Sequence, residues 1–400
     1  MNGRRADLAI VGGGLSGGLI ALALRNARPE LDVRLIEAGE RLGGNHRWSW
    51  FENDLGKSGN ELMQPFRKTE WQGYDVYFPK YSRRLKSRYY SLASPDFDAG
   101  LRRELAQDTV HTGRKVVECT PDSVTLEGGD AIPARAVVDC RGFEPSELVR
   151  GGWQVFMGRH LRTHAPHGIT RPVIMDVTVE QLDGYRFVYV LPLGASDIFI
   201  EDTYYNSNPE LDRGALSSRL DRYCRQNGWE GDIVGSETGV LPVITGGDFA
   251  AYRRERELDR MPQAGARALL AHPLTSYTLP QAVETARLIA RNADLPGDQL
   301  AALLAAHAQR HWNRTSYYRL LGRILFEAPQ PKERYRIFER FYTLDEDLIE
   351  RFYAARSRPQ EKARVLWGNP PVAIHRAIAA IFSKSAPLVV PDRTKGRVST

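Results

Sequence analysis

A glycine-rich turn between an apolar strand and a helix, near the start of the chain, constrains the fold more than any other feature. Residues 8–11 form a short apolar run of the length expected for a buried parallel strand, and residues 19–24 are apolar and rich in helix formers. Between these runs, Gly12, Gly14 and Gly17 follow the spacing G-x-G-x-x-G. The first glycine permits the turn, the second lets the backbone approach a pyrophosphate, and the third lets the helix pack on the strand. We therefore predict a dinucleotide-binding unit whose helix N-terminus binds phosphate.

An acidic residue and a glycine doublet after this unit favour FAD as its cofactor. A second apolar run, residues 33–36, ends in Glu37, twenty residues after Gly17. An acid at that spacing is expected to bind a ribose 2′-hydroxyl, which favours FAD or NAD over NADP. The Gly43-Gly44 doublet is common where a chain passes close to a flavin ring, and this favours FAD over NAD. The alternative for the doublet alone is an ordinary turn.

Two later segments are expected to complete the nucleotide-binding domain. Residues 136–139 form an apolar strand that ends in Asp139 and returns the chain to the parallel sheet. Gly265 precedes a loop with His272 and Pro273, and the loop leads into a helix. This layout is used to close over a flavin with backbone N–H groups. The sequence leaves open whether His272 is a ligand, an acid or a loop histidine without a role.

Charge and composition limit the classes of partner. The 400 residues, 42% hydrophobic and 26% charged, suit a globular enzyme with more than one structural unit. Lys and Arg exceed Asp and Glu by 55 to 49, giving a formal net charge of +6. Because no block of basic residues is present, we expect no nucleic-acid partner. The mild excess suits anionic lipid headgroups or phosphate ligands, or is a solvated surface without a partner.

Cysteine usage and hydropathy indicate a reducing compartment and no membrane span. The three cysteines have no paired spacing, which argues against a disulfide framework and against a zinc site, so we expect no metal. No secretory signal or apolar run of bilayer length is visible. We expect a cytoplasmic protein that touches a membrane, if at all, from its inner face. The sequence does not determine the oligomeric state.

The remaining segments predict a second sheet and a helical end. The segment 71–92 is rich in aromatic residues and is expected to form a β-ribbon pair inserted into the dinucleotide fold. Residues 96–106 are expected to form a helix with Ser94 as its cap. Residues 110–120 and 123–126 are expected to form strands of a small meander. Further strands are predicted at 154–161, 173–179, 186–191 and 198–205, with a helix at 208–226. A short amphipathic helix at 372–382 is expected either to dip into a membrane interface or to pack.

These elements predict an α/β fold, with a Rossmann-like FAD-binding domain of the two-dinucleotide-binding flavoprotein type, an inserted mainly antiparallel substrate sheet and a C-terminal helical region. We assign residues 1–65, 93–152 and 253–295 to the FAD-binding domain, 66–92 and 153–252 to the substrate domain, 296–385 to the helical region and 386–400 to a tail.

The strand at 198–205 carries two adjacent acids among aromatic residues. Strand alternation points Glu201 and Asp202 to opposite faces, so they are not expected to act as a jointly facing pair. Whichever acid faces the interior loses hydration, and its raised pKa suits a general acid. The alternative is an acid that is exposed or bound to one of the many arginines.

The chain resembles the bacterial lycopene β-cyclases, a flavin-dependent family of carotenoid biosynthesis, along most of its length. The resemblance rests on residues 12–17, 43–49, 176–187, 200–203, 272–280 and 348–354. The Glu-Asp-Thr and His-Pro motifs among these are specific to the family, whereas the glycine fingerprint is shared by many flavoproteins. Two departures lie in flavin loops: Arg47 stands where Thr is usual, and Leu274-Thr-Ser276 where Thr-Thr-Gly is usual.

The resemblance implies an isomerase that cyclises the linear ends of lycopene, and of other linear carotenoids, to β-ionone rings without net redox change. It implies that Glu201 protonates the end double bond and that reduced FAD, with NAD(P)H as the source of electrons, stabilises the carbocation. Asp202, on the other face of the strand, is expected to have a positioning or structural role. Peripheral association with the inner face of the cell membrane is also expected. The predicted cofactor contacts are Gly12, Gly14, Leu15, Ser16, Gly17, Glu37, Gly43, Gly44, His46, Asp139, Gly265, His272 and Pro273.

Two other classes share the nucleotide fold. The first is an FAD-dependent monooxygenase or prenyl (geranylgeranyl) reductase, and the second is a flavoprotein that only binds or senses. Against the first, the segment 264–268 lacks the Gly-Asp pattern usual in the flavin loop of oxygenases, and an oxygenase has no need of a buried proton donor at Glu201. Against the second, an acid held among aromatics is costly to keep without a use.

Overall fold

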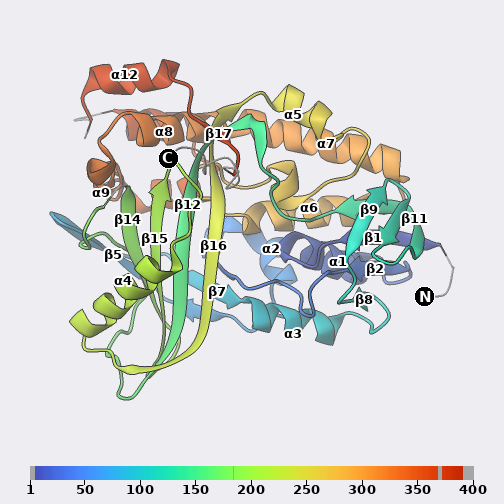
Figure 1. Ribbon diagram of the computed structural model, residues 1–400, viewed down its shortest axis with the longest axis horizontal. Coiled ribbons are helices and arrows are strands. Elements are labelled where there is room, and N and C mark those ends of the chain that lie inside the picture. The colour runs from blue at the N-terminus through green and yellow to red at the C-terminus, as the bar shows by residue number, and fades with distance from the viewer. Residues whose placement is uncertain (1–4, 183, 368–371, 391–400) are drawn as a thin grey trace, which may run out of the picture.

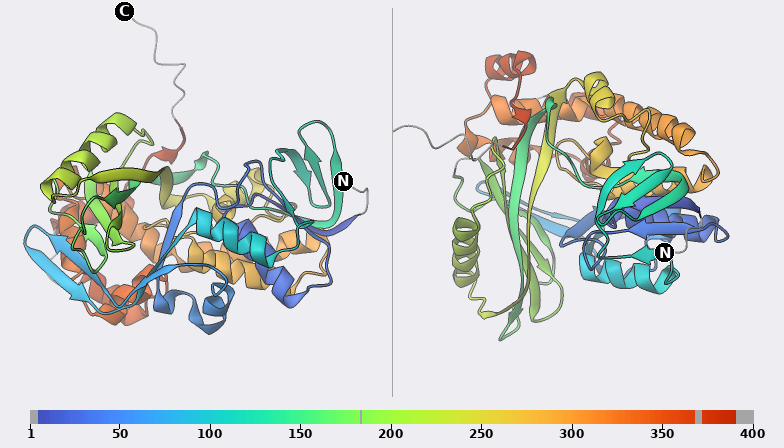
Figure 2. Two further views of the ribbon diagram at one scale, coloured as in Figure 1. Left: turned by 90° about the horizontal axis from the view of Figure 1, so that it is seen from below. Right: turned by 45° about the vertical axis from the view of Figure 1, so that its right-hand side comes forward.

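The computed structural model describes residues 5–182, 184–367 and 372–390. Figure 1 shows a nucleotide-binding sheet with its helices in one half of the molecule and a sheet of long strands in the other half. The C-terminal helices lie along one end of the long strands and extend over the first half (Figure 2). The predicted combination of a Rossmann-like domain, an antiparallel sheet and a helical end is confirmed. The exact domain boundaries stay a prediction.

The predicted strand–turn–helix unit forms the centre of the first sheet. Strand β1 (Ala6–Val11) pairs in parallel with β2 (Val33–Ile36) and with β11 (Ala131–Asp139), and α1 (Leu15–Ala27) follows the turn. Gly12 has a φ of +99°, in the left-handed region that favours glycine. A Cβ atom added to Gly17 would lie 1.9 Å from the Gly12 carbonyl oxygen, so only glycine permits this helix to approach the turn.

The six strands of this sheet are ordered β8-β2-β1-β11-β10-β9. The strand expected at 110–120 is two strands: β8 (Val110–His111) pairs in parallel with β2, whereas β9 (Val116–Thr120) pairs with β10 (Ser123–Leu126). Only β9, β10 and β11 therefore form the expected meander. The N-cap prediction for the helix that precedes β8 is wrong. Helix α3 (Ser94–Glu104) includes Ser94 as its first residue, and the Ser94 hydroxyl accepts a hydrogen bond from the His46 N–H.

The second sheet contains eight strands and confirms the four predicted ones. Along the main path the order is β16-β12-β15-β14-β13-β5-β6, and β17 (Pro387–Leu388) pairs with β12. The bounds are β12 (Ser146–Thr163), β13 (Val173–Asp176), β14 (Tyr185–Pro192), β15 (Asp197–Asn206) and β16 (Gly231–Gly247). The long strand β16 was not predicted from the sequence. Helix α4 (Arg213–Gln226) begins later than expected because the Asp212 side chain caps it by accepting from the Ala215 N–H.

The aromatic segment at 66–92 is divided between two sheets. Its hairpin β5 (Tyr74–Phe78) and β6 (Tyr81–Leu85) extends the large sheet through a parallel pairing of β5 with β13. Its outer strands β4 (Thr69–Trp71) and β7 (Tyr89–Ala93) form a third sheet with β3 (Arg47–Phe51), in the order β3-β7-β4. The expected β-ribbon pair is therefore found only in part, as β5 and β6, and the third sheet contributes residues to the region between the two halves.

The C-terminal region is helical, as predicted. Its helices are α7 (Gly297–Arg314), α8 (Ser316–Glu327), α9 (Tyr335–Phe341), α10 (Glu346–Tyr353), α11 (Pro359–Leu366) and α12 (Ile374–Phe382); α2 (Gly56–Leu62), α5 (Phe249–Glu255) and α6 (Leu279–Arg291) precede them. The aromatic residues of α9 and α10 pack in a core with strands β5 and β14. Helix α12 is the outermost element and lies over α8 (Figure 1). Of the predicted tail, residues 391–400 lie outside the described residues.

Candidate active site

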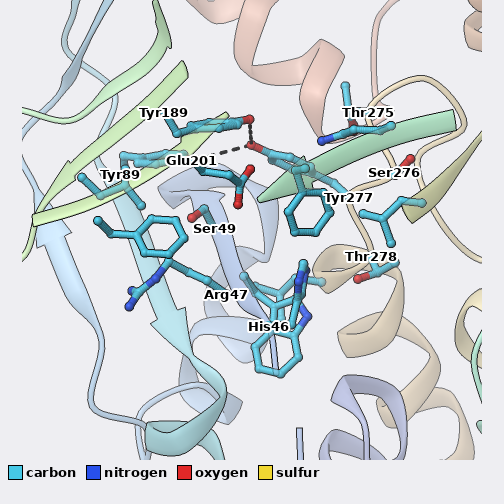
Figure 3. A pocket seen from close by; sticks show the side chains of 17 residues that line it. His46, Arg47, Ser49, Tyr89, Tyr189, Glu201, Thr275, Ser276, Tyr277 and Thr278 are labelled. Atoms are coloured by element: carbon cyan, nitrogen blue, oxygen red, sulfur yellow. Dashed lines mark hydrogen bonds between the residues drawn. The ribbon is translucent and has the colours of Figure 1, made fainter. Parts of the chain in front are cut away.

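A pocket lies where the large sheet meets β3, β7 and the loop before α6 (Figure 3). Six strands, the loop before α6 and the first residue of α6 contribute to its wall, and most of the side chains are aromatic, hydroxyl-bearing or charged. The lining residues are His46, Arg47, Trp48, Ser49, Tyr89, Gln154, Phe156, Tyr189, Leu191, Phe199, Glu201, Leu241, Thr275, Ser276, Tyr277, Thr278 and Leu279. Most of them lie far apart in the sequence, so the fold assembles this pocket.

Glu201 is the carboxylic acid in this wall. It lies on β15, 9% exposed, and its Oε1 atom accepts a hydrogen bond of 2.7 Å from the Thr203 hydroxyl. Burial raises the pKa of Glu201, because removal from water disfavours the charged form. Figure 3 shows its carboxyl group among the rings of Tyr89, Tyr189 and Tyr277. The side chain thus has the environment of a desolvated proton donor.

Three tyrosines form the side of the pocket nearest to Glu201. The Tyr277 hydroxyl lies 3.4 Å from the hydroxyls of both Tyr89 and Tyr189, as the dashed lines in Figure 3 mark. Burial raises the pKa of Tyr89 to about 12 and that of Tyr277 well above its usual value, so the phenols stay neutral at ordinary pH. Neutral aromatic rings present electron-rich faces that attract a cation.

Arg47 brings a positive charge to the same wall. Its guanidinium carbon lies 4.9 Å from the centre of the Phe199 ring, and its Nη1 donates to the Ser91 hydroxyl at 3.2 Å. Burial lowers the pKa of Arg47, while the nearby carboxyl groups of Glu237, Asp96 and Glu201 oppose that shift. This cation is the departure from the family pattern noted in the sequence.

The structure separates Asp202 from the pocket. Its side chain is fully buried on the opposite face of β15, where it accepts from the Arg186 Nη2 at 2.6 Å and from its Nε at 3.0 Å. Strand alternation was therefore predicted correctly. A catalytic contact of Asp202 is not supported, because the residue is absent from the pocket wall and is already paired with a buried cation.

A second cleft, of about 590 Å³, lies over the turn between β1 and α1. Seven of the predicted cofactor residues line it, namely Gly12, Gly14, Leu15, Ser16, Glu37, Gly43 and Gly44. The Glu37 carboxylate accepts from the Gly13 N–H at 2.6 Å and from the Gly39 N–H at 2.8 Å, which fixes its position at the cleft. Thr278 lines both this cleft and the Glu201 pocket, so the two sites adjoin.

The described residues fit a dinucleotide that carries a flavin. The Gly14 and Gly44 positions have no atom within 4 Å of an added Cβ, so their backbones are open to a ligand. The N-caps of α1 and α6, Gly14 and Thr278, make no side-chain capping bond, so helix N–H groups stay available for an anion. In the adjoining pocket, the buried Thr275 hydroxyl has no hydrogen-bond partner.

Several predicted cofactor residues lie away from the cleft. His46 lines the Glu201 pocket instead, where burial lowers its pKa to about 4. Asp139 is buried and bound to Arg141 at 2.8 Å, so it shapes the turn rather than a ligand surface. Gly17 and Gly265 do not line the cleft over the turn between β1 and α1. Gly265 packs against Ser16 instead, since a Cβ on Gly265 would lie 2.5 Å from the Ser16 hydroxyl.

His272 and Pro273 organise the loop before α6 rather than lining either site. The buried His272 ring donates from Nε2 to the Phe352 carbonyl at 3.1 Å and accepts at Nδ1 from the Thr275 N–H at 3.2 Å. Burial lowers the pKa of His272 to about 3, so the ring is neutral. The Pro273 carbonyl accepts from the Ile244 N–H at 2.8 Å, which joins the loop to β16. The loop-histidine alternative is thus the one that the structure supports.

Sequence reasoning missed the tyrosine group and Glu237. Tyr89, Tyr189 and Tyr277 come from three separate segments, and no spacing in the sequence indicates that they converge. Glu237 lies on the unpredicted strand β16, next to Glu201 in space. The one available signal was the alternation around residues 237–244, which glycine and proline obscure. Among the described residues, no cluster of His, Cys, Asp or Glu could hold a metal ion.

The chain is similar to known proteins along most of its length. A family model described as "Lycopene cyclase protein" matches residues 7–379. The "Lycopene beta-cyclase" of Pseudescherichia vulneris is 43% identical over 388 residues, which cover 97% of this chain and 98% of that protein. Among solved structures, a geranylgeranyl bacteriochlorophyll reductase-like protein from Thermoplasma acidophilum superposes with a TM-score of 0.60 at 15% identity, covering 94% of this chain and all of that one. A probable FAD-dependent monooxygenase from Pseudomonas aeruginosa superposes with a TM-score of 0.54 at 14% identity, covering 83% of this chain and 99% of that one. The structural likenesses show the flavoprotein fold.

Proposed function

The chain belongs to the lycopene cyclase family, and we propose on that basis that it converts the linear ends of lycopene into β-ionone rings, giving β-carotene by way of γ-carotene. The single observation that carries this proposal is the buried Glu201 carboxyl group in an aromatic pocket that adjoins the nucleotide cleft. Other linear carotenoids with the same end group are expected substrates. The reaction is an isomerisation, so substrate and product have the same atoms and electrons.

We infer that Glu201 starts the reaction. Its proton adds to the end double bond of the substrate, a tertiary carbocation forms, and the neighbouring double bond attacks that carbon to close the ring. Return of a ring proton to the Glu201 carboxylate completes the cyclisation and restores the acid, so protons balance. Protonating carbon requires a strong and desolvated acid, which agrees with the burial of Glu201. The rings of Tyr89, Tyr189 and Tyr277 stabilise the cation by up to about 2 kcal/mol each when desolvated.

We propose FAD as the resident cofactor and NAD(P)H as the reductant that keeps it reduced. The cleft residues from Gly12 to Gly44 would hold its phosphates and ribose, and Thr275 and Thr278 would contact the ring system. Reduced flavin, when bound, supplies negative charge in a low-dielectric site, where it stabilises a carbocation strongly. His46 and Trp48 close the pocket on the same side and help exclude water.

Turnover without oxygen tests this function against the monooxygenase alternative. Purified protein loaded with FAD is supplied with lycopene in liposomes and NADPH under strict anaerobiosis, and pigments are separated by chromatography. We expect γ-carotene and then β-carotene to accumulate as lycopene disappears. Dependence on oxygen, or an oxygenated or reduced pigment as the main product, would contradict the proposal.

We further propose that the protein is cytoplasmic and associates peripherally with the inner face of the cell membrane. No helix in the described part of the chain is long and apolar enough to span a bilayer. Helix α12, however, exposes Ile374, Ile378 and Phe382, the last being 82% exposed, and Trp367 nearby is 76% exposed. The sequence from 362 to 390 contains basic residues but no Asp or Glu. An apolar face with a basic surround suits anionic lipid.

An apolar cavity of about 140 Å³ lies between this face and the Glu201 pocket. It is lined by residues of α8 to α12, including Leu366, Val372 and Ala377 near the exposed face, and by Thr275, which also lines the Glu201 pocket. We infer that the carotenoid end passes from the bilayer along this cavity, because a C40 hydrocarbon is insoluble in water.

Vesicle binding tests the membrane proposal. Phe382→Lys with Ile378→Lys is expected to reduce co-sedimentation with phosphatidylglycerol-containing vesicles, since both changes place charge on the apolar face. The matched control Ala379→Lys adds one charge at an exposed position of the same helix outside the apolar stripe. Equal binding of all variants would contradict the assignment, and a concentration-dependent dimer lost in the double variant would indicate a second copy as the occupant.

A further inference from the structure

Two buried glutamates approach one another across a glycine in the large sheet. Gly158 on β12 is opposite Glu201 on β15 and also opposite Glu237 on β16. Residues that share a register position in a sheet point to the same face, and neighbouring strands lie about 4.8 Å apart. Two glutamate side chains span the resulting distance of about 10 Å only when the position between them has no side chain. A Cβ on Gly158 would lie 3.1 Å from the Glu237 Cγ and 2.3 Å from the Phe199 ring.

The carboxyl group of Glu237 has few other partners. The residue is 6% exposed, and its buried Oε1 atom has no hydrogen-bond partner. Burial raises the pKa of Glu237 well above its usual value, and the neighbouring Glu201, which shares the register position of Gly158, raises it as well. A raised pKa favours the neutral, hydrogen-donating form of the Glu237 carboxyl group.

The charged groups around the pair favour one ionised carboxylate at most. Arg47 from β3 is the cation that acts on both acids, and Asp202 behind β15 acts on Glu201 with the opposite sign. Thr203 donates to Glu201 from the same strand. Only Glu201 of the two lines the pocket. Glu237 is therefore placed to act through Glu201 rather than on a substrate.

We propose that Glu237 is a positioning residue for Glu201, and that its carboxylic acid donates a hydrogen bond to the Glu201 carboxylate that forms when the substrate is protonated. The proposal rests on the function proposed above. In the step, the Glu201 O–H bond breaks, its electron pair stays on the oxygen, and the π electrons of the substrate form the new C–H bond. Glu237 keeps its own proton throughout. Stabilising the conjugate base in this way makes Glu201 a stronger acid.

Two substitutions at Glu237 test the donor role in the full-length, FAD-loaded protein. Glu237→Leu removes the donor, and we expect cyclisation to slow on the order of 10- to 100-fold, the range for losing a hydrogen bond to a charged group. Glu237→Gln keeps an N–H donor and should retain most of the rate. The control Glu230→Leu changes an exposed glutamate just before β16 and should behave like wild type.

The pH profile distinguishes this role from a structural one. Activity requires protonated Glu201, so it falls as pH rises through the pKa of that residue. In Glu237→Leu we expect the falling limb to move to higher pH, because the carboxylate has lost its donor, and in Glu237→Gln it should stay. A limb that does not move in Glu237→Leu, or equal impairment of both variants, would overturn the inference. Glu201→Gln is measured in the same assay to separate two kinds of failure. If Glu201→Gln is inactive, a negative result for the Glu237 variants overturns only the role of Glu237. If Glu201→Gln is active, the proposed function itself is wrong.

If Glu237→Leu does not fold, infrared spectroscopy tests the protonation state of Glu237 directly. The difference spectrum between wild type and Glu237→Gln near pH 7 should contain the carbonyl band of a protonated carboxyl group. A carboxylate band in its place would show that Glu237 is ionised and would overturn the inference.

Discussion

Replacing Asp202 by Asn separates a structural role of this acid from a catalytic one. The Asp202 side chain is fully buried and Arg186 is 7% exposed, with three contacts of 2.6 to 3.1 Å between them. Removing one member of such a pair leaves the other charge buried and unpaired, which costs about 3–5 kcal/mol. We therefore expect Asp202→Asn to lower the free energy of unfolding by that amount, measured by urea denaturation.

The double variant Arg186→Leu with Asp202→Leu removes both charges. Because replacing a buried pair with apolar residues is often nearly neutral, we expect it to recover most of the lost stability. Asp294→Asn, in the exposed pair with Arg28, is the control and should leave the urea midpoint unchanged.

Activity is then measured per folded, flavin-containing molecule. We expect Asp202→Asn to cyclise lycopene at close to the wild-type rate, because its side chain points away from the pocket. Reduced turnover without reduced stability would refute this reasoning and would place Asp202 in the catalytic machinery.

Two further predictions concern the turn and the buried histidines. Gly17→Ala should lose bound flavin and stability, since its Cβ would overlap the Gly12 carbonyl. Gly14→Ala should fold normally and weaken flavin binding only, because an added Cβ there meets no protein atom. Calorimetry measures the stability of both variants, and flavin absorbance measures their bound flavin. His272 and His311 have pKa values lowered to about 3 by burial, from 6.5. They bind protons mainly when unfolded. Their contribution to stability should therefore be constant above about pH 6.5 and fall below it, by about 1.4 kcal/mol per pH unit for each histidine. His272→Gln should flatten this acid dependence in urea titrations, and the exposed His375→Gln should not; an equal slope in all three proteins would refute the assignment.

Local patterns in the sequence were sufficient to predict the nucleotide-binding half. The glycine spacing at 12–17, the acid at Glu37 and strand alternation at Glu201 each depend on neighbours along the chain, and the structure places these residues as expected. Steric limits and strand geometry act over a few residues, which is why such patterns can be recognised without the fold.

The rest of the site depends on contacts between distant segments. Strand β16 carries several glycines and a proline, so its strand character comes from a 15-residue pairing with β12 rather than from propensity. Glu237 and the tyrosine group are invisible until that pairing is known. His272 was predicted to contact the cofactor because it lies in a loop expected to close over the flavin. Its ring instead forms hydrogen bonds with backbone groups and holds the loop in place.

The most direct test of the account is the cyclisation activity of Glu201→Gln in cells that accumulate lycopene. Gln keeps the size of the side chain and its hydrogen bond with Thr203, but it cannot give up a proton to carbon. The account predicts that these cells stay red, with no γ- or β-carotene detected, while the purified variant is folded and retains its flavin. Yellow-orange cells containing β-carotene at the wild-type level would contradict it.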